Sequence, residues 1–305
     1  MDLKKKLADI SMQLFISKNK YQPKQVGDFY NKNHDAFIKV YGEVIQAFRT
    51  NNLDNILNSQ IDSIGLKKGQ RVLDAGCGVC GPARYFAKKT GCNIDAVTIS
   101  EVQLNAANKH IQQENLRDKI TVHLNDYHKV DTLFPKEHFD IAYFLESFGH
   151  SNQKEKLLKT IWKVLKPGGE VYIKDLFRRI SSSKLVQYKI DNEIQKINKA
   201  YFYDVADLNE FLTLVRKIGY IIVFVKTIDI PLEDFENLSI SNEFQELTGI
   251  AKIDNWEKYI LNSFTCPYTN GYTEGTNNKI KVLKRNAYGV RNFKRFRNRI
   301  LHVMS

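Results

Sequence analysis

The sequence predicts an α/β protein with a doubly wound, mostly parallel sheet. Between about residues 71 and 228, apolar runs of strand length alternate with amphipathic helical segments. Strands covered on both faces by crossover helices have this near-continuous apolar character. A glycine-rich turn, Asp74-Ala-Gly-Cys-Gly-Val-Cys-Gly, joins the first strand to the next helix. The 305 residues leave room for a helical cap before this core and an appendage after it.

The expected elements follow from this alternation in chain order. Helical spacing of apolar residues predicts a cap over residues 1–60, with helices at 3–17, 24–30 and 36–49. The expected strands are 71–74, 93–99, 120–124, 139–144, 170–175 and 220–228, and the expected core helices are 81–90, 101–115, 153–165 and 204–218. We assign residues 61–231 to the core and residues 232–305 to a basic, helical or irregular appendage.

The glycine-rich turn is expected to be a ligand cradle. Gly76 and Gly78 let the backbone come close to a bound molecule, and free amides at the helix start attract a carboxylate or phosphate. The spacing of these glycines and Gly81 also fits the pattern of nicotinamide dinucleotide sites. However, Asp74 stands where that pattern has a neutral residue, and the acid that would hold a ribose after the second strand is absent.

Three features together resemble the class I S-adenosylmethionine-dependent methyltransferases, which have a Rossmann-like fold. They are Asp74 with its glycines, the string Thr98-Ile-Ser-Glu-Val-Gln103, and Leu165-Lys-Pro-Gly-Gly169 between a helix and a strand. The resemblance covers about residues 25–231. The Thr-x-Ser-x-x-Gln arrangement is similar to that of the branch with cyclopropane-fatty-acid synthases and sterol methyltransferases. The resemblance implies methyltransferase activity with S-adenosylmethionine as cofactor.

The resemblance also implies a set of cofactor contacts. Asp74 would hold the amino-acid end, the glutamine near the ribose would be Gln103, and Asp126 would accept from the adenine amine. The plainer alternatives are a turn-capping Asp74, a surface Gln103 and a polar loop at Asp126. The full implied set is Asp74, Gly76, Gly78, Thr98, Ser100, Gln103, Asp126, Tyr127 and Glu146.

The fourth strand leads into Tyr143-Phe-Leu-Glu146-Ser-Phe-Gly-His150, which resembles the glutamate-containing segment of sterol and geranyl-diphosphate C-methyltransferases. Methylation of an alkene carbon leaves a carbocation, which aromatic faces and a carboxylate stabilise before a base removes a proton. We expect Glu146, Tyr30 and His150 to be catalytic, although His150 could instead only begin a helix. The expected aromatic wall is Tyr143, Phe144, Phe148 and Tyr30. Asp175 would orient substrate or cap a loop.

The predicted function is therefore C-methylation of an isoprenoid or lipid-like small molecule. The alternative is N- or O-methylation of a small metabolite, which needs no cation-stabilising pocket and would be indicated by a polar cavity around Glu146. No set of metal ligands is predicted. The histidines His110, His123, His128 and His138 lack ligand spacing and are expected on the surface or in loops.

The C-terminal segment has a different resemblance. From about residue 241 onward, and most clearly from Tyr268 to Tyr288, it is similar to the end of DDE-type insertion-sequence transposases. Glu274 matches the last metal-binding acid of that family, but the first two are not recognisable, so Glu274 is expected to be inert. We interpret the chain as a fusion; a genuine basic appendage is the alternative. The terminal antiparallel strand of the methyltransferase fold is not recognised, and its loss would expose a sheet edge and could leave the enzyme inactive.

Charge and composition complete the expectations. Of the net charge of +12, nine basic residues and no acid lie in 277–305, which would allow non-specific nucleic-acid binding through the tail. No apolar run reaches the roughly 18 residues of a membrane span. Four cysteines, with Cys77-x-x-Cys80 taken as chance spacing, fit a reducing cytoplasm.

Overall fold

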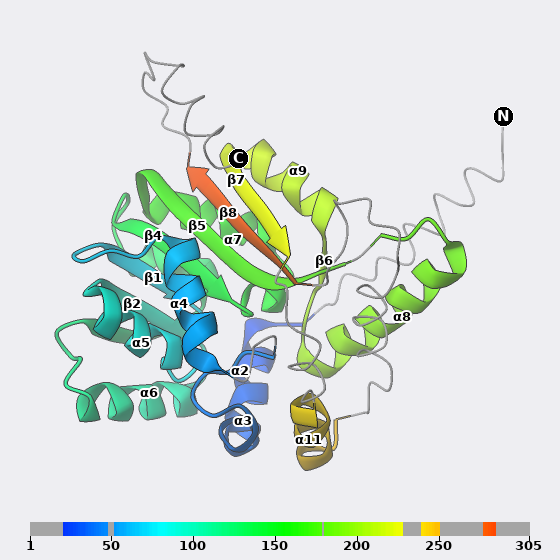
Figure 1. The fold of residues 1–305 in the computed structure, drawn as a ribbon, viewed down its shortest axis with the longest axis horizontal. Helices are drawn as coiled ribbons and strands as arrows, with labels where there is room; N and C mark the ends of the chain where they lie inside the picture. Colours follow the sequence, from blue (N-terminus) through cyan, green and yellow to red (C-terminus); the bar gives the residue numbers. More distant parts are fainter. Residues whose placement is uncertain (1–20, 48–51, 179, 228–238, 251–276, 285–305) are drawn as a thin grey trace.

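In the computed structural model the described residues are 21–47, 52–178, 180–227, 239–250 and 277–284 (Figure 1). They form a sheet in the order β3-β2-β1-β4-β5-β8-β7, with a short β6 paired to β5. The strands are β1 Arg71–Ala75, β2 Asn93–Thr98, β3 Ile120–Leu124, β4 Phe139–Leu145, β5 Leu165–Arg178, β6 Ala206–Asp207, β7 Tyr220–Thr227 and β8 Asn277–Lys284. The predicted doubly wound, mostly parallel sheet is confirmed.

Helices cover both faces of this sheet. The helices of the described residues, including those of the cap, are α2 Pro23–Lys32, α3 His34–Tyr41, α4 Leu53–Ile64, α5 Gly81–Thr90, α6 Glu101–Gln113, α7 Lys154–Val164, α8 Lys184–Tyr201, α9 Leu208–Ile218 and α11 Ser239–Thr248, with 3-10 turns η1 Tyr127–Thr132 and η2 Phe148–His150. Apolar side chains of α4, α5 and α6 pack in one core cluster, and those of α7 and α9 pack in another on the opposite face.

The strand β8 corrects the expectation for the C-terminal segment. It lies between β5 and β7 and pairs antiparallel with both, through Val171↔Val282 and Ile222↔Val282 among other partners. The terminal antiparallel strand that the sequence did not reveal is therefore present, and it lies inside the predicted helical or irregular appendage. Figure 1 shows β8 filling the space between the two strands, so the edge of β5 is not left open.

Several boundaries also differ from the sequence prediction. The helix expected over residues 36–49 ends at Tyr41, because Gly42 has a φ of 64° that a right-handed helix does not allow. The helices α4 and α8 were not predicted. The strand β5 extends well beyond 170–175 at both ends, so Asp175 lies within a strand and not after it.

The cap lies across the carboxyl ends of the strands and includes a helix from the C-terminal segment. Helices α2 and α3 share an aromatic cluster with α11, in which Phe29, Phe37, Tyr41 and Phe244 are buried. Figure 1 shows α11 beside α3, far in sequence from the cap helices. No helix among the described residues is long and apolar enough to span a membrane.

The position of β8 generates a stability prediction. Since β8 has a hydrogen-bonded neighbour on each side, proline at Val282 removes an N–H that the ladder uses. We expect Val282→Pro to lower the free energy of unfolding by roughly 1–3 kcal/mol, the cost of an unsatisfied backbone group. Urea denaturation followed by circular dichroism measures this change. Val282→Thr, which keeps the N–H and the branched shape, is the control. Equal midpoints for Val282→Pro and wild type would contradict the pairing.

Candidate active site

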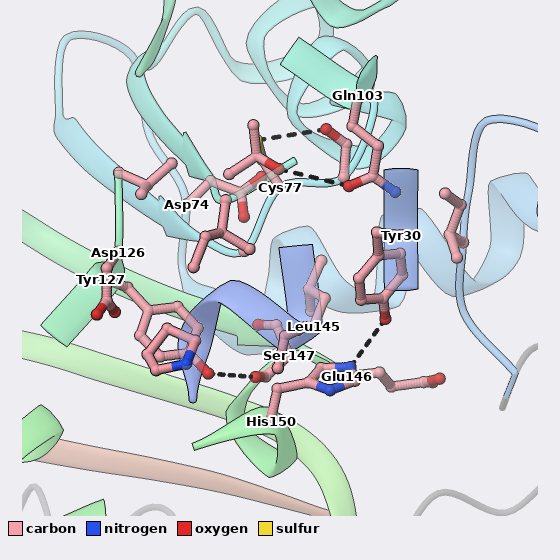
Figure 2. A pocket seen from close by; sticks show the side chains of 18 of the residues that line it. Tyr30, Asp74, Cys77, Gln103, Asp126, Tyr127, Leu145, Glu146, Ser147 and His150 are labelled. Carbon is pink, nitrogen blue, oxygen red and sulfur yellow. Dashed lines mark hydrogen bonds between the residues drawn. The ribbon is translucent and has the colours of Figure 1, made fainter. Parts of the chain in front are cut away.

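A cavity that is partly open to solvent lies at the carboxyl ends of β1, β2 and β4 and beneath α2. Ligands bind at this edge in open α/β sheets. Of the residues predicted from sequence, the cavity is lined by Tyr30, Asp74, Gly76, Gly78, Thr98, Gln103, Asp126, Tyr127, Glu146 and His150. The sheet thus brings together side chains from widely separated parts of the chain (Figure 2).

The glycine-rich turn packs tightly against the end of β4. Gly76 has a φ of 102°, and a Cβ there would lie 2.4 Å from the Cβ of Ser147. The Ser147 hydroxyl donates to the carbonyl of Ala75 at 2.5 Å. Only glycine satisfies both the backbone conformation and this contact. The floor of the cavity is therefore fixed by the packing of two strand ends.

Asp74 is a buried acid at the start of this turn. Its side chain accepts a hydrogen bond from the Tyr143 hydroxyl at 2.8 Å. Burial raises the pKa of Asp74 to about 7, although the Tyr143 hydrogen bond acts in the opposite direction. A cationic group entering the cavity beside Asp74 would offset the cost of its charge.

Of the residues predicted to lie near the ribose, Thr98 and Gln103 line the cavity and Ser100 does not. Thr98 donates to the Oε1 of Gln103 at 3.4 Å, and the buried Nε2 of Gln103 has no hydrogen-bond partner among the described residues. Ser100 caps α6 by accepting from the Gln103 N–H, and it donates to Asn31 at 2.6 Å. Ser100 does not line the cavity. Ser100 is therefore a helix cap that also attaches α2 to α6.

The 3-10 turn η1 after β3 contains a buried histidine. His128 was expected on the surface or in a loop, but it lies in η1, is 5% exposed and lines the cavity. Its Nδ1 pairs with Asp126 at 2.6 Å, and its Nε2 pairs with the Ser151 hydroxyl at 2.7 Å. The Tyr127 hydroxyl donates to the carbonyl of Ser147 at 3.1 Å. The spacing Asp126-x-His128 after a strand is the signal that could have indicated this pair.

Tyr30 and His150 form a hydrogen-bonded pair at the cavity wall. The Tyr30 hydroxyl lies 2.8 Å from the Nε2 of His150, as Figure 2 shows. The Nδ1 of His150 lies 3.1 Å from the carbonyl of Phe202, so Nδ1 carries the proton and Nε2 accepts from the hydroxyl. Burial lowers the pKa of His150 to about 4, which leaves the imidazole neutral at physiological pH.

A second layer holds this histidine in place. The ring of Tyr203 lies 4.5 Å from the His150 ring in an edge-on contact, and its hydroxyl donates to Asp175 at 2.5 Å. Asp175 also accepts from the N–H of Gly149 at 2.9 Å. Burial raises the pKa of Asp175 to about 6. Asp175 is thus a support for the loop that carries His150, and it does not line the cavity.

Glu146 reaches the cavity but its carboxylate is already engaged. One oxygen pairs with Lys174, and the other accepts from the N–H of Ala47 at 2.7 Å. Lys174 is 1% exposed and donates to Gln46 at 2.5 Å. Glu146 itself has a φ of 59°, which a residue other than glycine adopts at a cost. Sequence analysis missed Lys174, although a lysine within an otherwise apolar strand was the available signal.

The expected aromatic wall is mostly wrong. Phe144 and Phe148 pack in the core cluster that includes side chains of α7 and α9. Tyr143 is hydrogen-bonded to Asp74. None of the three lines the cavity. Successive side chains of a strand point to opposite faces, which turns Phe144 away from its neighbours Tyr143 and Leu145. The tyrosines at the cavity are Tyr21, Tyr30 and Tyr127.

Comparison with known proteins agrees with this geometry. Residues 72–169 match the model of the Methyltransferase domain family, and residues 226–300 match a Transposase family of the DDE ISL3 type. A sterol 24-C-methyltransferase of Gibberella zeae is 40% identical over 107 residues, which are 35% of this chain and 28% of that enzyme. The chain therefore matches less than a third of that relative's length.

Solved structures share the fold. A phosphoethanolamine N-methyltransferase 2 of Haemonchus contortus, in complex with S-adenosyl-L-methionine, is 20% identical with a TM-score of 0.64; the alignment covers 85% of this chain and 60% of that one. A geranyl diphosphate C-methyltransferase of Streptomyces coelicolor is 16% identical with a TM-score of 0.55, covering 76% of both chains.

These findings confirm both predicted resemblances. The chain contains a methyltransferase domain with the class I fold, followed by a segment related to a transposase. The transposase-like match begins within β7 and includes α11 and β8. Glu274, the acid singled out in that segment, lies outside the described residues.

The buried carboxyl of Asp74 generates a prediction about pH. An acid whose pKa is higher in the folded than in the unfolded protein makes the folded state less stable as it deprotonates, so this contribution falls from about pH 4 to about pH 7. The free energy of unfolding of Asp74→Asn should therefore increase relative to that of wild type, by roughly 4 kcal/mol between pH 4 and pH 7. Urea unfolding at several pH values measures the difference, in which other titrating groups cancel. The exposed Asp118→Asn is the control, and a flat Asp74→Asn difference would rule out the raised pKa.

Proposed function

We propose that the chain is an S-adenosylmethionine-dependent methyltransferase acting on a small molecule, and that the acceptor is an unsaturated isoprenoid methylated on carbon. The observation that carries the proposal is the cavity at the glycine-rich turn, where Asp74 and the free amide of Gln103 face the same space. The free thiols Cys77, Cys80 and Cys92 are consistent with a cytoplasmic location.

The donor set of the cavity suits this cofactor. Asp74 offers a carboxylate to the ammonium of the amino-acid end, and its raised pKa means that binding of that cation would release a proton. The Nε2 of Gln103 is a buried donor without a partner among the described residues, which a ribose hydroxyl would satisfy. Asp126 and Tyr127 also line the cavity, and they would contact the adenine ring.

The Tyr30–His150 pair is the proposed route for a proton. When bound, S-adenosylmethionine supplies a methyl group on a positively charged sulfur, and that charge disappears as the methyl group leaves. The acceptor loses a proton to the Tyr30 oxygen while the Tyr30 proton passes to the Nε2 of His150, which becomes an imidazolium. The Phe202 carbonyl holds the tautomer that leaves Nε2 free to accept.

Similarity to a carbon methyltransferase favours carbon as the methyl acceptor. The sterol 24-C-methyltransferase match is 40% identical over 107 residues. The carbocation formed on an alkene must lose a proton, which the Tyr30–His150 pair would accept. Glu146 would act on this cation only weakly, because Lys174 already balances its charge.

Nitrogen or oxygen methylation is a second candidate, and one observation favours it. The surroundings of Glu146 are polar, since Lys174, Gln46 and the Ala47 N–H all contact it or its partner. A pocket for a carbocation would be expected to surround this position with aromatic faces. Incubation with methyl-labelled S-adenosylmethionine and a panel of prenyl diphosphates, sterols, amines and phenols, with and without magnesium, discriminates the two. A label found only on nitrogen or oxygen would overturn carbon methylation.

Nucleic-acid binding by the basic tail stays a prediction.

The cofactor site generates a binding prediction. We expect Gln103→Leu to weaken binding of S-adenosylhomocysteine by about 10-fold, because one hydrogen bond to a ribose hydroxyl is lost and an apolar side chain replaces the amide. Isothermal titration calorimetry measures the affinity. Gln113→Leu, at an exposed position of the same helix α6, is the matched control. Absence of measurable binding by the folded wild-type chain would overturn the proposed cofactor.

The proton route generates a kinetic prediction. We expect Tyr30→Phe to lower kcat by about 10²- to 10⁴-fold, the usual contribution of general acid–base catalysis, while the affinity for S-adenosylhomocysteine changes little. The exposed hydroxyl of Tyr85, on α5, provides the control Tyr85→Phe. Single-turnover methyl transfer to the acceptor found above isolates the chemical step. An unchanged rate for Tyr30→Phe would remove the pair from the mechanism.

A further inference from the structure

The helix α11 lies within the transposase-like segment, yet it packs against α3 in the aromatic cluster of the cap. It contacts α3 (Figure 1), and its side chain Phe244 is fully buried. Gln245 beside it is also buried and hydrogen-bonds Tyr201 at the end of α8. The helix is thus attached to two parts of the methyltransferase region, one through apolar and one through polar contact.

A continuous series of ring contacts runs from α11 to the cavity. The Phe244 ring lies 4.3 Å from that of Phe37, and the Phe37 ring stacks on Tyr30 at 4.9 Å with an interplanar angle of 24°. The Tyr30 hydroxyl then reaches His150 at 2.8 Å. Phe244 therefore packs against Phe37, the residue on which Tyr30 stacks.

The position of the Tyr30 ring depends on this support. Stacking with Phe37 fixes one face of the ring, and a 2.8 Å hydrogen bond to His150 tolerates little displacement of the hydroxyl. Phe37 can hold its place only while the volume behind it is filled, because a void there forfeits the contacts that oppose its rotation. Phe244, with Tyr41 and Tyr201 around it at 5.8 and 6.2 Å, fills that volume.

We propose that Phe244 is a positioning residue for the Tyr30–His150 pair, so that the transposase-like segment forms part of the methyltransferase site. The proposal rests on the function proposed above for that pair. It assigns no chemistry to the transposase-like segment itself. Phe244 acts only through Phe37 and Tyr30, and it does not line the cavity.

The test reads the hydrogen bond directly. The full chain is labelled with ¹⁵N-histidine, and the His150 resonances are assigned by their loss in His150→Gln. Tyr30→Phe then defines the Nε2 shift of His150 without its partner. We expect Phe244→Ala to move the Nε2 signal most of the way to the Tyr30→Phe position, and Phe244→Leu to restore most of the wild-type shift. Leu247→Ala, at a 45% exposed position of α11, should leave it unchanged.

A kinetic measurement separates positioning from general loss of structure. Phe244→Ala should lower kcat by about 10- to 100-fold, as small misplacement of a catalytic group does, with unchanged affinity for S-adenosylhomocysteine. A lowered melting temperature with wild-type His150 signals would overturn the proposal and leave Phe244 as core packing. If Phe244→Ala does not fold, wild-type signals in Phe244→Val would have the same meaning. The spectra need no cofactor, so failure of wild type to bind S-adenosylhomocysteine tests the proposed function separately.

Discussion

The buried ion pair between Glu146 and Lys174 is the contact on which the site depends. It joins Glu146, directly after β4, to Lys174 within β5, and through Gln46 and the N–H of Ala47 it holds the segment after α3 against the sheet. Both charges are removed from water, so the pair is stable only because each partner also has further hydrogen bonds. The left-handed backbone of Glu146 is the cost of turning its carboxylate toward Lys174. The cap is thus attached to the sheet by a polar contact at the place where the reaction would occur.

This contact also decides which residues are free to act. A glutamate that balances a buried lysine cannot stabilise a cation strongly, whereas the neutral His150 has an open acceptor nitrogen directed at Tyr30. Burial has opposite effects on the two kinds of group: it lowers the pKa of His150 to about 4 and raises that of Asp74 to about 7. Both pKa shifts favour the uncharged form of the side chain, in a cavity that would bind a positively charged cofactor. In the proposed mechanism the proton is therefore accepted by the Tyr30–His150 pair and not by Glu146.

The sequence predicted the parts of the fold that local pattern determines. The glycine-rich turn, the first strand and the cavity position of Asp74 follow from spacing alone, because each depends on neighbours within a few residues. Which side chain of a strand end faces the cavity depends on register, so Phe144 was misplaced by one position. Lys174 and His128 were missed since their meaning comes from partners far away in the chain. The strand β8 was missed for the same reason, as pairing with β5 and β7 makes it a strand.

The C-terminal segment meets requirements that are easy for an unrelated sequence to satisfy. The place between β5 and β7 needs backbone donors and acceptors in an extended run, which most sequences can supply, and an unpaired edge there would invite association with other chains. The place beside α3 needs one large apolar side chain of the right size, which Phe244 provides. Neither role uses the chemistry of a transposase. The two matches in this chain are therefore compatible with one folded unit, in which the second completes the sheet and the cap of the first.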